Sequence, residues 1–206
     1  MIGQLWHAGS AEQEEPYFTA VKDGFRELGY IEDRNIAFEC RFPAEQYERY
    51  NSLAAELVAL KVDVLMAVTG PAAAATKVAT TTIPIVFVLV PNPVESKLVN
   101  SLSRPGGNIT GFSNIATDLT AKRLEIFKDT VVGMSRVAAL INSNDPDVAQ
   151  RTIDDVKGAA ATLNLTVEPI KLRKVDELEG VFSRISNEQF QGVVLPFDGM
   201  LYNARG

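Results

Sequence analysis

The sequence predicts an α/β protein built from two doubly wound parallel-sheet lobes. Strand-like and helix-like segments alternate along nearly all of the 206 residues, and repeated strand–helix–strand units with short connections form parallel sheets. Residues 62–68 and 85–90 are nearly continuous apolar runs, as expected for parallel strands that are covered on both faces. A new series of strand–helix units starts after "GFSN", residues 111–114, which indicates a second lobe.

The stretch "GFSNIATD", residues 111–118, is the predicted domain boundary. It divides the chain into an N-terminal lobe, residues 1–113, and a second lobe, residues 114–206. The second lobe has only three predicted strands, fewer than a doubly wound lobe usually contains. We therefore expect the second lobe to be incomplete.

The secondary-structure elements follow from hydrophobic periodicity and from turn residues. The predicted strands are residues 2–7, 35–41, 62–68, 85–90, 109–113, 137–141, 167–172 and 192–195. The predicted helices are residues 16–28, 46–60, 71–80, 93–102, 118–129, 147–163 and 175–186.

Several helix ends carry the residues that helix termini prefer. Gly29 stands where a C-terminal cap needs a left-handed residue. Pro71 and Pro93 stand where a first helical turn tolerates a missing N–H. Asp145 and the pair Thr117-Asp118 offer N-cap side chains. These signals fix the expected starts of four helices and the end of one.

Composition excludes several classes of function. The net charge of -6 argues against a nucleic-acid partner, because nucleic-acid binding needs a basic face. The chain has one cysteine, Cys40, and one histidine, His7, which excludes zinc sites built from these residues. No apolar stretch approaches the length of a membrane span. We expect no metal and no cofactor, and we expect Cys40 to be a buried, inert thiol.

The predicted binding site lies at the strand-to-helix junctions, because open parallel sheets bind ligands beyond the carboxyl ends of their strands. The free N–H groups at a helix N-terminus hold an anion without any charged side chain, and residues 69–72 and 92–94 are expected to act in this way. The predicted ligand-binding residues of the first lobe are Ser10, Thr69, Gly70, Ala72, Asn92 and Ser113. Asn142 and Asp198 are predicted to contribute from the second lobe.

Other candidates have two interpretations each. His7 is either a base or ligand contact or a structural histidine, and Trp6 and Phe112 either stack on a flat ligand or belong to the core. The acidic stretch "AEQEE", residues 11–15, is interpreted as a solvated loop or first helical turn. No nucleophile–base motif, dinucleotide fingerprint or phosphate-binding loop is present, so no catalytic residue is predicted.

Three long stretches resemble one known family. They are "GFRELGYIEDRNIAFECRF", the run from "LAAELVALKVDVLMAVTGP" to "SLSRPGGNITGFSN", and "AKRLEIFKDTVVGMSRVAALINSNDP". The family is that of the ABC transporter substrate-binding proteins associated with uptake of tryptophan and other amino acids. The resemblance covers nearly the whole chain, and the segment "TTTIPIVFV" through "RPGGNITG" is its most specific part.

The resemblance implies a type I periplasmic-binding-protein fold and a non-enzymatic solute-binding component of an ABC importer. Such a protein holds a small polar ligand, an amino acid or a related carboxylate, in a cleft between its lobes. It works with a membrane permease and is periplasmic or anchored outside the cytoplasmic membrane as a lipoprotein, after removal of a signal peptide. The family commonly has Gly-Asp-Pro where this chain has Pro91-Asn92-Pro93, and Gly-Thr-Pro or a similar sequence where it has Thr69-Gly70-Pro71. The ligand's identity is therefore not carried over.

Two other functions stay open on the same fold. One is the ligand-sensing module of a regulator or sensor, for which the sequence shows no attached DNA-binding or signalling segment. The other is an α/β enzyme, against which the absence of catalytic constellations argues.

Overall fold

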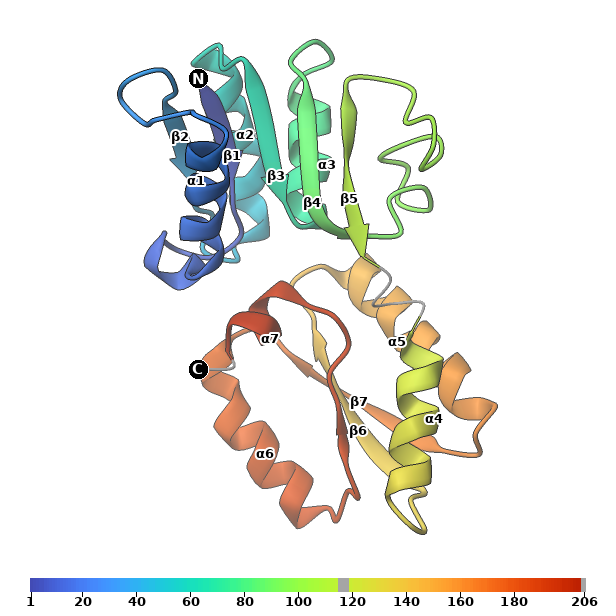
Figure 1. The fold of residues 1–206 in the computed structure, drawn as a ribbon. Coiled ribbons are helices and arrows are strands. Elements are labelled where there is room, and N and C mark those ends of the chain that lie inside the picture. The colour runs from blue at the N-terminus through green and yellow to red at the C-terminus, as the bar shows by residue number, and fades with distance from the viewer. Residues whose placement is uncertain (115–118, 205–206) are drawn as a thin grey trace. The chain divides into compact units, whose positions relative to one another are not determined.

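The protein is described by a computed structural model that covers residues 1–114 and 119–204. It divides into two compact units, Met1–Asn114 and Ile115–Gly206, and each unit contains its own parallel β-sheet (Figure 1). The prediction of two separate parallel sheets is thereby confirmed.

The first unit contains a five-stranded parallel sheet with the strand order β2-β1-β3-β4-β5. Its strands are β1 (Ile2–Leu5), β2 (Phe38–Arg41), β3 (Val64–Val68), β4 (Ile85–Pro91) and β5 (Ile109–Asn114). The chain passes from β1 to β2 on one side and then crosses back to β3 on the other side. The strand order therefore reverses between β1 and β3, and this position is the topological switch point of the sheet.

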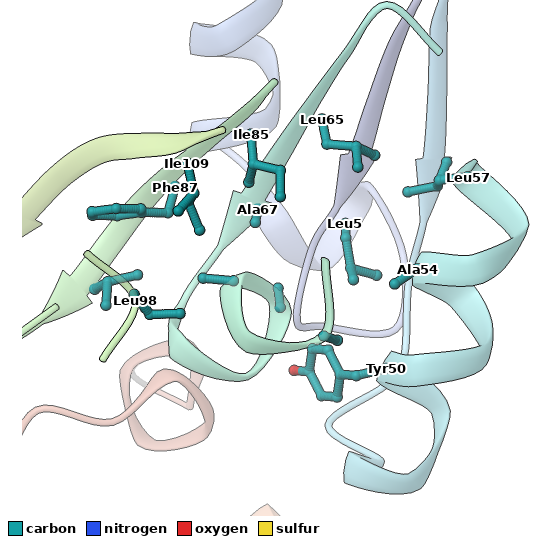
Figure 2. Packing of buried hydrophobic residues seen from close by; sticks show 14 of the residues in the cluster. Leu5, Tyr50, Ala54, Leu57, Leu65, Ala67, Ile85, Phe87, Leu98 and Ile109 are labelled. Atoms are coloured by element: carbon teal, nitrogen blue, oxygen red, sulfur yellow. The ribbon is translucent and has the colours of Figure 1, made fainter. Parts of the chain in front are cut away.

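The alternation of side chains along β1 assigns its two faces to different helices. Leu5 packs with residues of α2 (Tyr50–Ala59) and α3 (Gly70–Ala79) in the main hydrophobic core of the unit (Figure 2). Trp6 points to the opposite face, where its ring lies 5.4 Å from that of Phe18 in α1 (Tyr17–Glu27). Two short 3-10 helices, η1 (Glu12–Glu14) and η2 (Tyr47–Arg49), precede α1 and α2.

The second unit contains a three-stranded parallel sheet with the order β7-β6-β8. Its strands are β6 (Arg136–Asn142), β7 (Thr166–Leu172) and β8 (Val193–Val194), and its helices are α4 (Thr120–Thr130), α5 (Pro146–Ala161), α6 (Leu178–Asn187) and α7 (Gly199–Asn203), with η3 (Val175–Glu177) before α6. Alternate residues of β6 belong to two cores: Val137 and Ile141 pack with α4 and α5, whereas Leu140 packs with α6 and α7. This sheet is covered on both faces, and its switch point lies between β6 and β8.

Two of the predicted helix ends have the expected geometry. Gly29 follows α1 with a φ of +85°, in the left-handed region that glycine tolerates best. The Asp145 carboxylate accepts hydrogen bonds from the backbone N–H groups of Asp147 and Val148 at the start of α5. Thr117 and Asp118 lie outside the described residues.

The predicted helix over residues 93–102 is wrong, because this segment consists of turns. Asn92 adopts a φ of 47°, and its carbonyl oxygen accepts both the N–H and the hydroxyl of Ser96. The N–H groups of Leu98 and Val99 both bond to the carbonyl of Pro93. These bonds close tight turns, so Pro93 does not start a helix and the predicted anion site at residues 92–94 has no helix N-terminus.

Cys40 in β2 is half-buried rather than fully buried, and its thiol lies 3.5 Å from the side-chain oxygen of Gln4. Burial, the largest cause, raises the pKa of the Cys40 thiol to about 11. Because the thiol is the uncharged form, any stability gained from this shift is present below the unfolded pKa of about 8.5 and is lost as the pH rises towards 11.

We expect Cys40 to react at least 100-fold more slowly with a thiol reagent at pH 8 in the folded protein than in urea, since only about one thiol in a thousand is ionised when its pKa is 11. The measurement is the rate of thiol modification with and without urea. Equal rates in both states would contradict the assignment of Cys40 as an inert thiol.

Candidate functional site

The candidate site lies at the carboxyl ends of β1 and β3, at the switch point of the first sheet. Open α/β sheets bind their ligands at this position. Thr69 directly follows β3, and Ser10 lies in the loop that follows β1. Asn92 directly follows β4 and Ser113 lies near the end of β5, so both are at the same edge and Ser113 is separated from β3 by a whole strand.

Thr69 has an unusual backbone conformation, with φ 76° and ψ 168°. This region is populated almost only by glycine, and a residue with a side chain held there costs about 1–3 kcal/mol. Thr69 is nevertheless buried and tied into the sheet by its N–H, which donates to the carbonyl of Val88 over 3.0 Å. Backbone strain of this size is found mostly at functional sites, where the surrounding structure holds the residue in place.

The helix that follows Thr69 begins without side-chain capping. Thr69 makes no side-chain bond to the first turn of α3, and that turn contains no acidic residue. The N–H groups of Gly70 and Ala72 precede the first i→i−4 partner of the helix, and Pro71 has no N–H. Ala72 is fully buried in the core, so its side chain is not a ligand contact in this structure. The junction therefore presents donors and a partial positive charge.

Tyr50, the first residue of α2, belongs to the same hydrophobic core as the first turn of α3. Tyr50 is only 3% exposed, and its ring lies in the main core below Leu5 and Ala54, with the hydroxyl directed away from α2 (Figure 2). Burial, followed by the nearby carboxylates of Glu45 and Glu14, raises the pKa of Tyr50 far above its usual range. The phenol therefore remains neutral and keeps its O–H.

A buried acid–base cluster supports the loop after β1. His7 Nδ1 lies 2.7 Å from Glu45 Oε1, and His7 Nε2 lies 3.4 Å from Glu14 Oε2. Glu14 Oε1 also accepts the backbone N–H groups of His7 and Ala8, over 3.1 and 2.8 Å. A neutral imidazole carries one N–H, whereas the imidazolium donates from both nitrogens, so the charged form matches this pair of carboxylates.

These contacts decide between the two interpretations of His7 in favour of a structural role. They also correct the interpretation of "AEQEE" as solvated, because Glu14 is only 2% exposed. The short helix η1 turns Glu14 inward while Glu12 stays exposed, and the side chain of Ser10 bonds to Glu12 and lowers the pKa of that carboxylate.

The two other predicted ligand contacts of this edge, Asn92 and Ser113, differ in their exposure to solvent. Asn92 is half-buried and follows a bulge in β4 at Leu89, which has a φ of 57°. Ser113 is exposed near the end of β5. The rings proposed for stacking also differ: Trp6 is a core residue with 2% exposure, whereas Phe112 is 73% exposed.

In the second unit, the structure brings Asn142 and Asp198 together. Asn142 ends β6 and Asp198 follows β8, so both lie at the switch point of this sheet. The amide of Asn142 donates to Asp198 Oδ2 over 3.0 Å, and Asp198 Oδ1 accepts the N–H of Leu201 at the start of α7. These bonds give both residues a structural role in joining the two strand ends.

The sequence interpretation missed two residues of the cluster around His7: Glu14 and Glu45. Glu14 differs from its acidic neighbours only in burial, and Glu45 is brought to His7 by left-handed conformations at Ala44 and Glu45, each with a φ of 57°. No sequence motif signals such a contact across 38 residues.

Within residues 1–114 and 119–204, no group of three or more His, Cys, Asp or Glu residues is arranged to hold a metal ion. In the same ranges no helix is both long enough and apolar enough to cross a membrane.

Two doubly wound parallel sheets with polar groups at their switch points define a type I periplasmic-binding-protein architecture. The family model of ABC transporter substrate binding proteins matches residues 14–204. The chain therefore belongs to the ABC transporter substrate-binding protein family.

Known proteins resemble this chain in sequence or in fold. A tyrosine-binding protein of Clostridioides difficile (strain R20291) is 34% identical over 119 residues, which are 56% of this chain and 34% of that protein. A conserved domain protein from Vibrio cholerae has a TM-score of 0.80 at 24% identity, over 93% of this chain and 64% of its own. The ABC domain from Streptococcus pneumonia in complex with L-Trp has a TM-score of 0.77 at 21% identity, over 98% of this chain and 67% of its own. The chain thus spans about two thirds of these structures and aligns with one third of the curated relative.

Proposed function

We propose that this protein is a non-enzymatic solute-binding component of an ABC importer and that it binds an amino acid or a related small carboxylate. It delivers this ligand to a membrane permease and acts outside the cytoplasmic membrane, where such a component meets its solute. Family membership supports the class of function, and the relatives that bind tyrosine and L-Trp support the ligand class.

The observation that carries the ligand class is the junction at Thr69. Thr69, in its strained conformation, precedes the N-terminus of α3, whose first turn offers backbone N–H groups and contains no acidic residue. A carboxylate is held by such N–H groups without any basic side chain. Ser10, Asn92 and Ser113 are proposed as further contacts along the same edge. Asn142 and Asp198 are proposed as ligand contacts of the second unit, in addition to their structural bonds.

The alternative function, a ligand-sensing module of a regulator, predicts the same ligand class. A different test is therefore needed to distinguish it from a solute-binding component. A solute-binding component associates with its permease in a ligand-dependent way, whereas a sensor module does not. The two proposals are distinguished by whether the ligand-loaded protein stimulates ATP hydrolysis by its reconstituted transporter.

The ligand class is tested by thermal shift with a panel of amino acids, small organic acids and sugars. A ligand present at about 100 times its Kd stabilises the folded form by roughly 2.7 kcal/mol. We expect a shift with one or a few amino acids or organic acids. A shift with sugars alone would contradict the proposed ligand class.

Thr69→Val removes the hydroxyl while keeping the branched side-chain shape at the same strained position. We expect it to weaken binding of the amino acid that gives the largest thermal shift by roughly 1–3 kcal/mol, the cost of leaving a buried polar group without its bond. Calorimetry measures the change, and Thr69→Ser, which retains the hydroxyl, is the control. Unchanged affinity in Thr69→Val would exclude the hydroxyl as a ligand contact.

A further inference from the structure

We propose that His7 determines how well the ligand site accepts a carboxylate: its imidazolium offsets the charges of Glu14 and Glu45 beside the start of α3, so the affinity for an anionic ligand depends on the protonation of His7. This inference rests on the proposed function and deepens it, because it gives a side chain that acts through its charge a role in selecting the ligand.

The first observation is the position of His7 relative to Thr69. Strands β1 and β3 are paired in parallel, and Leu5 lies opposite Ala67. His7 and Thr69 each follow this pair by two residues, so they leave adjacent strands at the same level of the sheet, at its switch point. Thr69 leads directly into α3, where the ligand carboxylate is proposed to bind. The charge on His7 therefore lies beside the proposed anion site within one compact unit.

The second observation is the buried contact of both imidazole nitrogens with carboxylates. His7 Nδ1 lies 2.7 Å from Glu45 Oε1, and His7 Nε2 lies 3.4 Å from Glu14 Oε2. The side chains of His7 and Glu14 are only 7% and 2% exposed, so water has little access to their contact. An imidazolium donates from both nitrogens, whereas a neutral imidazole leaves one nitrogen lone pair against a carboxylate oxygen. Loss of the proton therefore removes one of the two favourable contacts.

The third observation is the charge that the cluster carries. Two carboxylates and one imidazolium leave a net charge of -1, and the neutral imidazole leaves -2. An anion at the start of α3 is therefore repelled more strongly when His7 is neutral.

The neighbouring elements contribute few other groups that could titrate. Their charged or titratable side chains nearest in the chain are Arg41 of β2, Tyr47 and Arg49 of η2, and Tyr50 of α2. Between pH 6 and pH 9 arginine stays charged, carboxylates stay ionised and tyrosine stays mainly neutral. His7 is therefore the group of this neighbourhood whose charge is expected to change.

The experiment follows the titration of His7 by NMR in the free and the ligand-loaded protein. His7 is the only histidine of the chain, so its imidazole signals are unambiguous. The ligand is the amino acid that gives the largest thermal shift, with L-tryptophan and L-leucine as the first probes. We expect the ligand to raise the pH midpoint of the His7 titration by about 0.5–1 unit, the effect of one charge across roughly 10 Å of partly buried protein.

Calorimetry measures the reciprocal effect on the ligand. Because the coupling between two binding events is the same in both directions, the affinity should fall about three- to tenfold between one pH unit below the free midpoint and one unit above the loaded midpoint. His7→Gln should lack this fall, and the ligand's own titration cancels because both proteins bind the same molecule. An equal fall in wild type and His7→Gln would overturn the role of His7.

A second pair of variants keeps the test open if His7→Gln does not fold. Glu45→Gln removes the more exposed carboxylate of the cluster, whose side chain is 24% exposed, and should lower the midpoint of His7 while the ligand still raises it. Glu48→Gln removes the same charge from an exposed residue of η2 and should leave the midpoint unchanged. Equal midpoints in these two variants would contradict the charge pairing of His7 with Glu45.

The outcomes separate this inference from the proposed function. If no amino acid or organic acid binds at any pH from 6 to 9, the proposed ligand class fails and the inference fails with it. If a ligand binds but does not move the midpoint of His7, or if His7 does not titrate while the protein stays folded, the proposed function stands and the role of His7 is overturned.

Discussion

Replacing Gly111 by alanine is expected to lower the melting temperature by about 10 °C, the shift for a loss of roughly 3 kcal/mol or more in a protein of this size. Gly111 lies in β5 directly opposite Phe87 of β4. A Cβ at this position would overlap the backbone carbonyl oxygen of Phe87 and lie 2.6 Å from its ring. The carbonyl cannot move without disturbing the hydrogen bonds between β4 and β5. The substitution therefore destabilises the pairing of these two strands.

Gly107→Ala is the matched control for this change. Gly107 lies in the loop before β5, and a Cβ there meets nothing within 4 Å. We expect its melting temperature to stay within about 2 °C of wild type, as for an ordinary surface substitution. A Gly111→Ala protein as stable as the Gly107→Ala protein would contradict the close approach of the two strands.

Replacing Glu14 by glutamine is expected to lower the free energy of unfolding by about 3–5 kcal/mol, the cost of breaking a buried ion pair by removing one partner. The Glu14 carboxylate accepts two backbone N–H groups and faces His7. A side-chain amide of the same shape can keep its oxygen on the two backbone N–H groups, but it then turns an NH2 group towards His7 Nε2 in place of a carboxylate oxygen. The effect combines a lost charge with unsatisfied buried groups.

Two further variants provide comparisons for the loss of stability in Glu14→Gln. Glu45→Gln removes the other carboxylate of His7, whose side chain is 24% exposed, so water reduces the loss. Glu12→Gln changes an exposed carboxylate in the same short helix and should leave stability within about 0.5 kcal/mol of wild type. Urea unfolding measures all three. A loss for Glu14→Gln no larger than that for Glu12→Gln would show that the buried cluster contributes nothing to stability.

The sheets could be predicted from the sequence because their signals are local. The apolar runs that form β3 and β4 have the pattern of doubly covered strands, and Asp145 caps α5 as its position indicates. Local sequence signals could not decide whether residues 93–102 form a helix or turns. A proline suits both a first helical turn and a tight turn, and the left-handed conformation of Asn92 selects the turn.

Only the location of the candidate site could be predicted from the sequence. Parallel strands bring their carboxyl ends to one edge, so Thr69 follows from strand order alone. The strain at Thr69, the burial of Tyr50 and the inward turn of Glu14 depend on contacts that form only in the folded chain. Such contacts leave no periodic pattern, so composition and spacing gave no indication of them.

The central claim is that the start of α3 binds a carboxylate. An NMR titration of the uniformly 15N-labelled protein with the amino acid that gives the largest thermal shift tests it most directly. The account predicts that the largest amide shifts fall at Thr69, Gly70 and Ala72, and that they are absent when the carboxylate of the ligand is replaced by an amide. Shifts confined to other parts of the chain, or identical shifts with the carboxamide, would contradict it.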